Sequence, residues 1–347
     1  MRKLYTLHNQ ALQTLHMDLE NQATLEPTVL LGTPGTLLIR KNADGLRFYS
    51  RQFYDASGKQ REAYVAGPVG STAAEQRAEA LKLQIDQSKA ISKELRLLGR
   101  EGYQLSDAKT YNTLASLHNH GLFRAGAVLI GSHAFGVLLN QLGVRAARYA
   151  TEDIDLARGE SLSFETPLKQ SLLELLQGSG LPFVEVTGFR AKSPPTQWKE
   201  RGRSRFHLDL LAPSPDDSFQ EIPVPELGAY ATGVPYLRYL ISAPQNALLS
   251  SRNGCFQVKA PTPERFAVHK LLVAQRRPAR SQKSLKDLDQ SAILLAALGE
   301  HHPGAIEEAL DDAPVSAMRD IRRSIAQLQA KLEGPHPQAW EAISSAL

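Results

Sequence analysis

The stretch from Ala125 to Leu156 limits the fold of this 347-residue chain more than any other. Its first part, AGAVLIG, is a continuous apolar run that ends in glycine, which is typical of a buried strand. The next part, SHAFGVLLNQLG, has apolar residues at helical spacing and ends in a glycine, where helices often stop. The last part, EDIDL, alternates acidic and apolar residues as a half-buried strand does. The stretch therefore predicts a strand, a helix and a second strand.

Two carboxylates flank one isoleucine in the second of these strands. Because residues i and i+2 of a strand point to the same face, Asp153 and Asp155 project together while Ile154 points into the core. Neighbouring carboxylates repel each other unless a positive group lies between them, and a divalent cation with oxygen ligands, Mg²⁺ or Mn²⁺, is the usual one. A strand end with two solvated acids is the alternative, and the pair alone does not decide between them.

Gly131 and Ser132 stand where the first strand turns into the helix. Backbone N–H groups and the helix dipole favour phosphate at such a turn, and glycine lets the backbone approach a ligand closely. An ordinary helix N-cap at Ser132 is the alternative. The pair becomes fairly specific only because an Asp-x-Asp strand follows it.

A third carboxylate is offered by the segment RGRSRFHLDLLAP, which contains Asp209. If the segment is a strand, its polar residues Arg203, Arg205, His207 and Asp209 share one face. We interpret this face as suited to metal and polyphosphate. A solvated edge strand, whose basic residues prevent aggregation, is the alternative.

The part of the chain before residue 122 carries no catalytic constellation. Residues 1–25 are predicted to be a polar helical arm, and turn signals separate the strands predicted at 36–41, 46–54 and 61–66. Helices are expected at 72–98, at 107–121, from Pro263, in the segment KSLKDLDQSAILLAALGE, and twice within 304–347. The expected domains are residues 1–118, 119–220 and 221–347.

Composition limits the partners and the compartment. The net charge is +4 and the isoelectric point about 9.0, which allows an anionic partner without identifying one. The single cysteine, Cys255, excludes an internal disulfide framework and fits a reducing compartment. We find neither a signal peptide nor the ~18 consecutive apolar residues of a membrane helix. We therefore expect a cytoplasmic chain without a membrane partner.

The order of these motifs resembles the nucleotidyltransferase superfamily of the DNA polymerase β type. The matching residues are Gly131 and Ser132, then Asp153 and Asp155, then the lone Asp209 on a later strand. The resemblance implies an α/β (α+β) fold, in which a polymerase β-type core lies between a small β-rich N-terminal region and a helical C-terminal region.

The prolonged helix between the first two motifs is similar to the bacterial branch of the AbiEii and MenT toxins and related uncharacterised nucleotidyltransferases. That branch has a lysine on a later helix and an aspartate on the next, which Lys270 and Asp287 match in order and separation. The resemblance covers roughly residues 119–300. It implies a possible RNA or tRNA acceptor and a possible antitoxin partner.

The resemblance also implies roles for the site residues. The activity is transfer of a nucleoside monophosphate from an NTP to an acceptor hydroxyl, with two Mg²⁺ or Mn²⁺ ions. The expected catalytic residues are Asp153, Asp155, Asp209 and Lys270, of which the three aspartates hold metal. The expected nucleotide-binding residues are Gly131, Ser132, Arg148, Arg205, Lys270 and Asp287.

The basic run from Arg276 to Lys286 contains five lysines and arginines and no acid. It is interpreted either as the path of an RNA backbone or as a solvated loop, and the absence of aromatic residues weakens the RNA interpretation. Two other functions remain open. In the first, the chain has a nucleotidyltransferase fold without catalytic activity and acts as a binding module. In the second, it is a nucleic-acid-binding protein in which the basic residues bind the ligand and the aspartates have no role.

Overall fold

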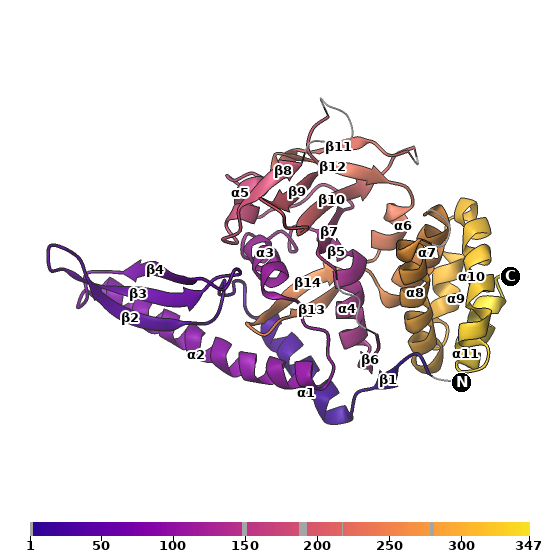
Figure 1. Ribbon diagram of the computed structural model, residues 1–347, viewed down its shortest axis with the longest axis horizontal. Coiled ribbons are helices and arrows are strands. Elements are labelled where there is room, and N and C mark those ends of the chain that lie inside the picture. The colour runs from indigo at the N-terminus through magenta and orange to yellow at the C-terminus, as the bar shows by residue number, and fades with distance from the viewer. Residues whose placement is uncertain (1–2, 148–150, 187–192, 217, 278–280) are drawn as a thin grey trace.

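The structure, a computed structural model, describes residues 3–147, 151–186, 193–216, 218–277 and 281–347. A mixed sheet stands in the middle of the molecule (Figure 1). A small antiparallel sheet and the long helix α2 extend from one side of it, and the C-terminal helices stand together on the opposite side. Both ends of the chain lie on this helical side.

The central sheet has seven strands of mixed direction. Its middle strand, β10, is parallel to β7 on one side; on the other it pairs with β9 along its first half and with β12 along its second half. The strands are β5 (Ala127–Ile130), β7 (Asp153–Arg158), β8 (Phe183–Val186), β9 (Gln197–Glu200), β10 (His207–Pro213), β11 (Glu221–Val224) and β12 (Ala229–Val234). The predicted α/β class is confirmed, and the sheet continues past residue 220, where the core was expected to end.

The N-terminal region has the predicted succession of elements. The strands β2 (Thr36–Lys41), β3 (Arg47–Tyr54) and β4 (Gln60–Ala66) form an antiparallel sheet, followed by α2 (Thr72–Arg100) and α3 (Ala108–Asn119). Ser71 caps α2 and Asp107 caps α3 through side-chain oxygens that accept backbone N–H groups. Before them, β1 (Thr6–Leu7) pairs with β6 (Val144–Arg145), and α1 (Gln10–Thr24) follows.

The remaining elements surround the sheet. They are α4 (Gly131–Gln141), α5 (Leu172–Gln177), α6 (Leu237–Ile241), the hairpin β13 (Gln245–Ser250) and β14 (Cys255–Ala260), α7 (Pro263–Arg276), α8 (Gln282–His301), α9 (Ala305–Asp311), α10 (Met318–Leu332) and α11 (Pro337–Ser344). The prediction of two helices after residue 304 is wrong, because there are three. Pro314 and the pair Gly334-Pro335 interrupt the region, since proline cannot continue a helix.

The N-terminal segment reaches across to the C-terminal helices. The backbone N–H of Leu4 donates to His336 Nε2 at 3.0 Å, and the Tyr5 hydroxyl donates to Glu300 Oε2 at 2.8 Å. Tyr5 also stacks on the ring of His336, and the side chain of Tyr5 is buried. The first and last parts of the chain are thus packed against each other.

The core lies on one face of β7 and β10. Ile154, Leu156, Leu208 and Leu210 are at most 1% exposed, so these side chains point into the hydrophobic core. The residues between them must therefore project from the opposite face. In the part of the chain that the structure describes, no helix is long and apolar enough to cross a membrane.

Candidate active site

Three carboxylates meet on two neighbouring strands. In the register of β7 with β10, Asp155 lies opposite Asp209, and Asp153 lies opposite His207. Burial, together with the carboxylates of Asp209 and Asp153, raises the pKa of Asp155 to about 6. The structure therefore brings the three predicted metal ligands together, and their negative charges repel one another.

His207 supplies positive charge between two of these carboxylates. Its Nδ1 lies 3.4 Å from Asp153 Oδ1, and its Nε2 lies 3.7 Å from Asp209 Oδ2. Asp209 in particular raises the pKa of His207 to about 9, so the imidazole is protonated near neutral pH. The sequence placed His207 on the same strand face as Asp209 but gave no reason to assign it a role.

The donor set fits a hard divalent cation. Carboxylate oxygens suit Mg²⁺ or Mn²⁺, and one oxygen of Asp209, Oδ1, is buried without a hydrogen-bond partner among the described residues. Across the described ranges, no three His, Cys, Asp or Glu side chains already form a metal-binding group. Because His207 is in ion-pair contact with Asp153 and Asp209, a cation held by both would have to replace the imidazole there.

Gly131 allows the turn before α4 to lie directly against Asp155. Its φ is +68°, in the left-handed region that favours glycine, and a Cβ at this position would come within 1.9 Å of Asp155 Oδ2. Since α4 begins at Gly131, Ile130 holds the N-cap position and Ser132 lies in the first turn, so the alternative of a Ser132 cap is wrong. The predicted phosphate-binding turn and the carboxylate strand are therefore in contact.

Substituting Gly131 tests this contact. Gly131→Ala is expected to displace the carboxylate of Asp155 and to strain the backbone, which costs about 1–3 kcal/mol at a position of this kind. Catalytic activity should be lost almost completely, whereas the free energy of unfolding, which denaturant titration measures, should fall only by that amount. Gly304→Ala is the matched control, because Gly304 also has positive φ but nothing lies within 4 Å of its added Cβ. Equal losses of activity in both variants would contradict a specific role for the Gly131 contact.

Lys270 and Asp287 form a buried ion pair between α7 and α8. Lys270 Nζ lies 2.6 Å from Asp287 Oδ1, and Arg277 Nε lies 2.5 Å from the other oxygen, Oδ2. Lys270 is only 8% exposed and Asp287 2%, so the alternatives of a surface lysine and a solvated helix acid are wrong. The charge of Lys270 also acts on Asp155 and lowers the pKa of that carboxyl against the larger effect of burial. This geometry makes Asp287 the residue that positions Lys270.

A second lysine near the carboxylates was missed. Lys286 is half-buried, and its pKa is lowered by burial and by Lys270, while Asp287, Asp153 and Asp155 act in the opposite direction. It therefore lies within electrostatic range of both strand aspartates. Lys283, one turn earlier on α8, is exposed. In the sequence, both lysines belong to the same basic run, and nothing in that run indicates which of them lies near the carboxylates.

The structure describes only one of the two arginines predicted to bind nucleotide. Arg148 falls outside the described residues. Arg205 is exposed, and β10 begins only at His207, so the strand face predicted to contain Arg203 and Arg205 does not extend to them. Within the basic run, Arg276 pairs with Asp320, and Arg277 pairs with Asp287. Both arginines therefore form ion pairs with other residues of the chain.

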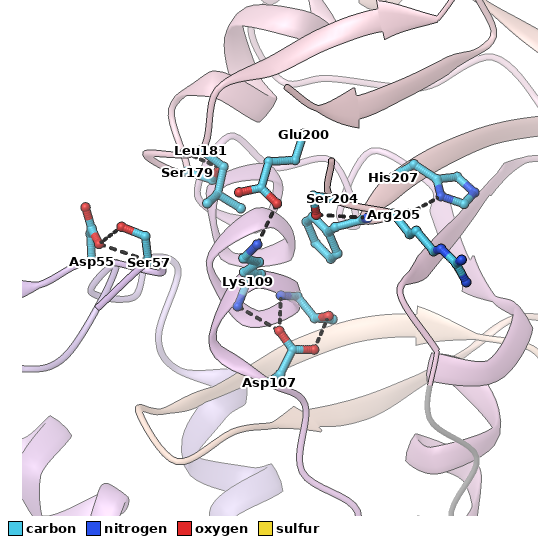
Figure 2. Close-up of polar contacts among 12 residues, drawn as sticks. Asp55, Ser57, Asp107, Lys109, Ser179, Leu181, Glu200, Ser204, Arg205 and His207 are labelled. Carbon is cyan, nitrogen blue, oxygen red and sulfur yellow. Dashed lines mark hydrogen bonds and ion pairs between the residues drawn. The ribbon is translucent and has the colours of Figure 1, made fainter. Parts of the chain in front are cut away.

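The segment that leads into β10 is held beside the start of α3, as Figure 2 shows. Lys109 Nζ donates to Glu200 Oε2 at 2.5 Å, which ties the first turn of α3 to the end of β9. His207 Nδ1 lies 2.7 Å from the carbonyl oxygen of Arg205, which further orients the imidazole. These two contacts hold the segment before β10 in place and orient the ring of His207.

Comparison with known proteins adds independent information. A family model described as a nucleotidyltransferase matches residues 108–314, which is more than half of the chain. The matched range includes the three strand aspartates, Lys270, Lys286 and Asp287. Among solved structures, the chain is similar to an antigenic nucleotidyltransferase-like protein from Paracoccidioides brasiliensis, with 16% identity, 68% of this chain and 91% of that chain covered, and a TM-score of 0.36. That likeness is too low to carry an argument. No curated protein matches the chain.

Proposed function

This chain belongs to the nucleotidyltransferase family, and we propose that it transfers a nucleoside monophosphate from an NTP to an acceptor hydroxyl with the help of divalent cations. One observation carries the proposal. Three carboxylates lie together on adjacent strands, one of them, Asp155, lies against the glycine turn of a helix, and a buried lysine from another helix acts on the same site. Such a site combines oxygen ligands for metal with backbone and side-chain donors for phosphate.

Each residue has a distinct task in this proposal. Asp153, Asp155 and Asp209 would hold the cations, which would supply positive charge to the triphosphate during an in-line displacement. The N–H groups of the turn at Gly131 and Ser132 contact the β- and γ-phosphates.

The other groups act on the acceptor and on the departing phosphates. Asp209 orients the acceptor hydroxyl and takes its proton as the hydroxyl oxygen bonds to the α-phosphorus. The bond from that phosphorus to the bridging oxygen breaks, and pyrophosphate leaves with the electron pair. Lys270 and Lys286 neutralise the charge that grows on the pyrophosphate.

The finer placement of the chain is also part of the proposal. The resemblance in motif order and spacing supports placing the chain in the bacterial toxin-like branch, and an RNA or tRNA acceptor and an antitoxin partner are what that branch implies. The cytoplasmic location stays a prediction from the single cysteine.

Transfer of label tests the activity directly. The protein is incubated with each α-labelled NTP, Mg²⁺ and total bacterial RNA or lysate, and the labelled molecule is identified. We expect one class of acceptor to become labelled and EDTA to abolish the labelling. RNA binding that persists in EDTA, without any transfer from any NTP, would instead support the nucleic-acid-binding alternative.

The two lysines of α8 provide a further prediction. Lys286→Gln is expected to lower kcat/KM by roughly ten- to a hundredfold, because a hydrogen bond to a charged group contributes about 1.5–3 kcal/mol. Lys283→Gln removes the same charge from an exposed position one turn away and should change kcat/KM less than about twofold. Steady-state kinetics with a saturating acceptor measures both. Equal losses would show that the charge of the helix surface, not the position of Lys286, matters.

A further inference from the structure

One cavity adjoins the active site beside the first turns of α4, and a second cavity continues from it. On another side of α4, the ring of Phe135 stacks on that of Phe266 from α7. The first cavity has a volume of about 420 Å³ and is lined by Ser132 and Thr151, which flank the glycine turn and the carboxylate strand. Its wall also contains His133, whose buried Nε2 has no hydrogen-bond partner among the described residues. A ligand in this cavity therefore reaches the edge of the active site.

The second cavity continues from the first and is lined by arginines. It has a volume of about 730 Å³ and shares the segment Leu105–Asp107 with the first cavity. Arg96 and Arg100 come from α2, and Arg252 comes from the turn between β13 and β14. All three are exposed, and none forms an ion pair with another residue that the structure describes. Three arginines without an ion-pair partner among the described residues thus line one cavity, against a single acid.

The framework of the second cavity is fixed by hydrogen bonds between its elements. The Ser92 hydroxyl of α2 donates to the carbonyl oxygen of Asn253 at 3.2 Å, which holds α2 against the hairpin turn. The N–H of Ser106 donates to the carbonyl oxygen of Ser250 at 2.8 Å, which holds the shared segment against the same hairpin. The arginines therefore project from anchored backbone.

The chemistry of the lining selects phosphate rather than a base or a cation. No aromatic residue lines the second cavity, so bases have no stacking partner there. Its one acid, Asp107, is occupied as the cap of α3, where it accepts from the N–H groups of Lys109 and Thr110. Arginine guanidinium groups bind phosphate oxygens well and carry no sequence information when they do.

We propose that the acceptor is a nucleic-acid strand whose phosphodiester backbone binds the second cavity through Arg96, Arg100 and Arg252, so that the strand reaches the active site along the first cavity. This inference rests on the proposed function. It replaces the basic run from Arg276 to Lys286 as the path of the strand, because Arg276 and Arg277 are already paired with Asp320 and Asp287. Recognition of this kind depends on charge and is weakened by salt.

Binding of a labelled single-stranded RNA oligonucleotide, followed by fluorescence anisotropy over a range of salt concentrations, tests the proposal. In the triple variant Arg96→Gln, Arg100→Gln, Arg252→Gln, the slope of log affinity against log salt is expected to become shallower by about 2, since each phosphate contact on a single strand contributes about 0.7. The control variant Lys82→Gln, Lys89→Gln, Arg323→Gln removes the same charge from exposed positions outside both cavities and should keep the wild-type slope.

Other results would overturn the proposal. They are an unchanged slope in the arginine variant, equal changes in both variants, no RNA binding by the wild type, or an affinity no greater than that of a mononucleotide. Failure of the proposed function looks different. A wild-type protein that binds RNA through these arginines, yet transfers label to no acceptor, contradicts the transferase activity and leaves the binding cavity standing.

Discussion

Asp155→Asn is expected to abolish nucleotidyl transfer while leaving the protein at least as stable as the wild type in metal-free buffer. The substitution keeps the shape of the side chain and removes a charge that the cations need. A loss of about 4 kcal/mol of transition-state stabilisation corresponds to roughly a thousandfold in rate. The stability should not fall, because Asp155 is held near other carboxylates and its pKa is raised by burial and by Asp209 and Asp153. Removing its charge relieves that repulsion.

Two measurements separate these effects. Label transfer at saturating Mg²⁺ gives the rate, and thermal unfolding with and without Mg²⁺ gives the stability. The wild type should be stabilised by Mg²⁺, whereas Asp155→Asn should respond much less. Asp86→Asn, an exposed acid on α2, is the control and should behave as the wild type does. A wild-type rate in Asp155→Asn would remove the metal assignment.

Lys270→Met is expected to damage both stability and activity. Breaking a buried ion pair costs about 3–5 kcal/mol, and we expect about 3 kcal/mol because Arg277 still contacts Asp287. If Lys270 also contacts the triphosphate, kcat/KM should fall by a hundredfold or more at temperatures where the variant is fully folded. Denaturant unfolding and steady-state kinetics on the same preparation measure the two losses.

A double variant distinguishes the two roles of Lys270. Lys270→Met combined with Asp287→Asn removes the buried acid that has lost one of its two cationic partners, so part of the lost stability should return. The rate should remain low, because the positive charge near the carboxylates is still missing. Recovery of rate together with stability would mean that Lys270 only supports the packing of α7 on α8. The site would then depend on Lys286 for its lysine.

Local sequence patterns predicted most strands, whereas the point at which a strand begins depended on its pairing with neighbouring strands. The alternation around Asp153 and Asp155 is a property of β7 itself, so it was readable from the sequence. The start of β10 was not, because pairing with β7 and β9 begins at His207 and leaves Arg203 and Arg205 outside the strand. Likewise, the roles of Lys283 and Lys286 differ only through the way α8 packs on α7. No helical period contains that information.

The contacts of Tyr5 also indicate the order in which parts of the protein fold during synthesis. Tyr5 and its partner Glu300 are separated by 295 positions in the sequence. During synthesis, the N-terminal segment must therefore wait until the chain has been made past Glu300. The glycine turn at Gly131 and the strand that carries Asp155 lie more than a hundred residues before Glu300, whereas Lys270 and Asp287 come shortly before it. The docking of Tyr5 thus follows the synthesis of α8, and a nascent chain that has not reached α7 contains the three aspartates without Lys270 and Lys286.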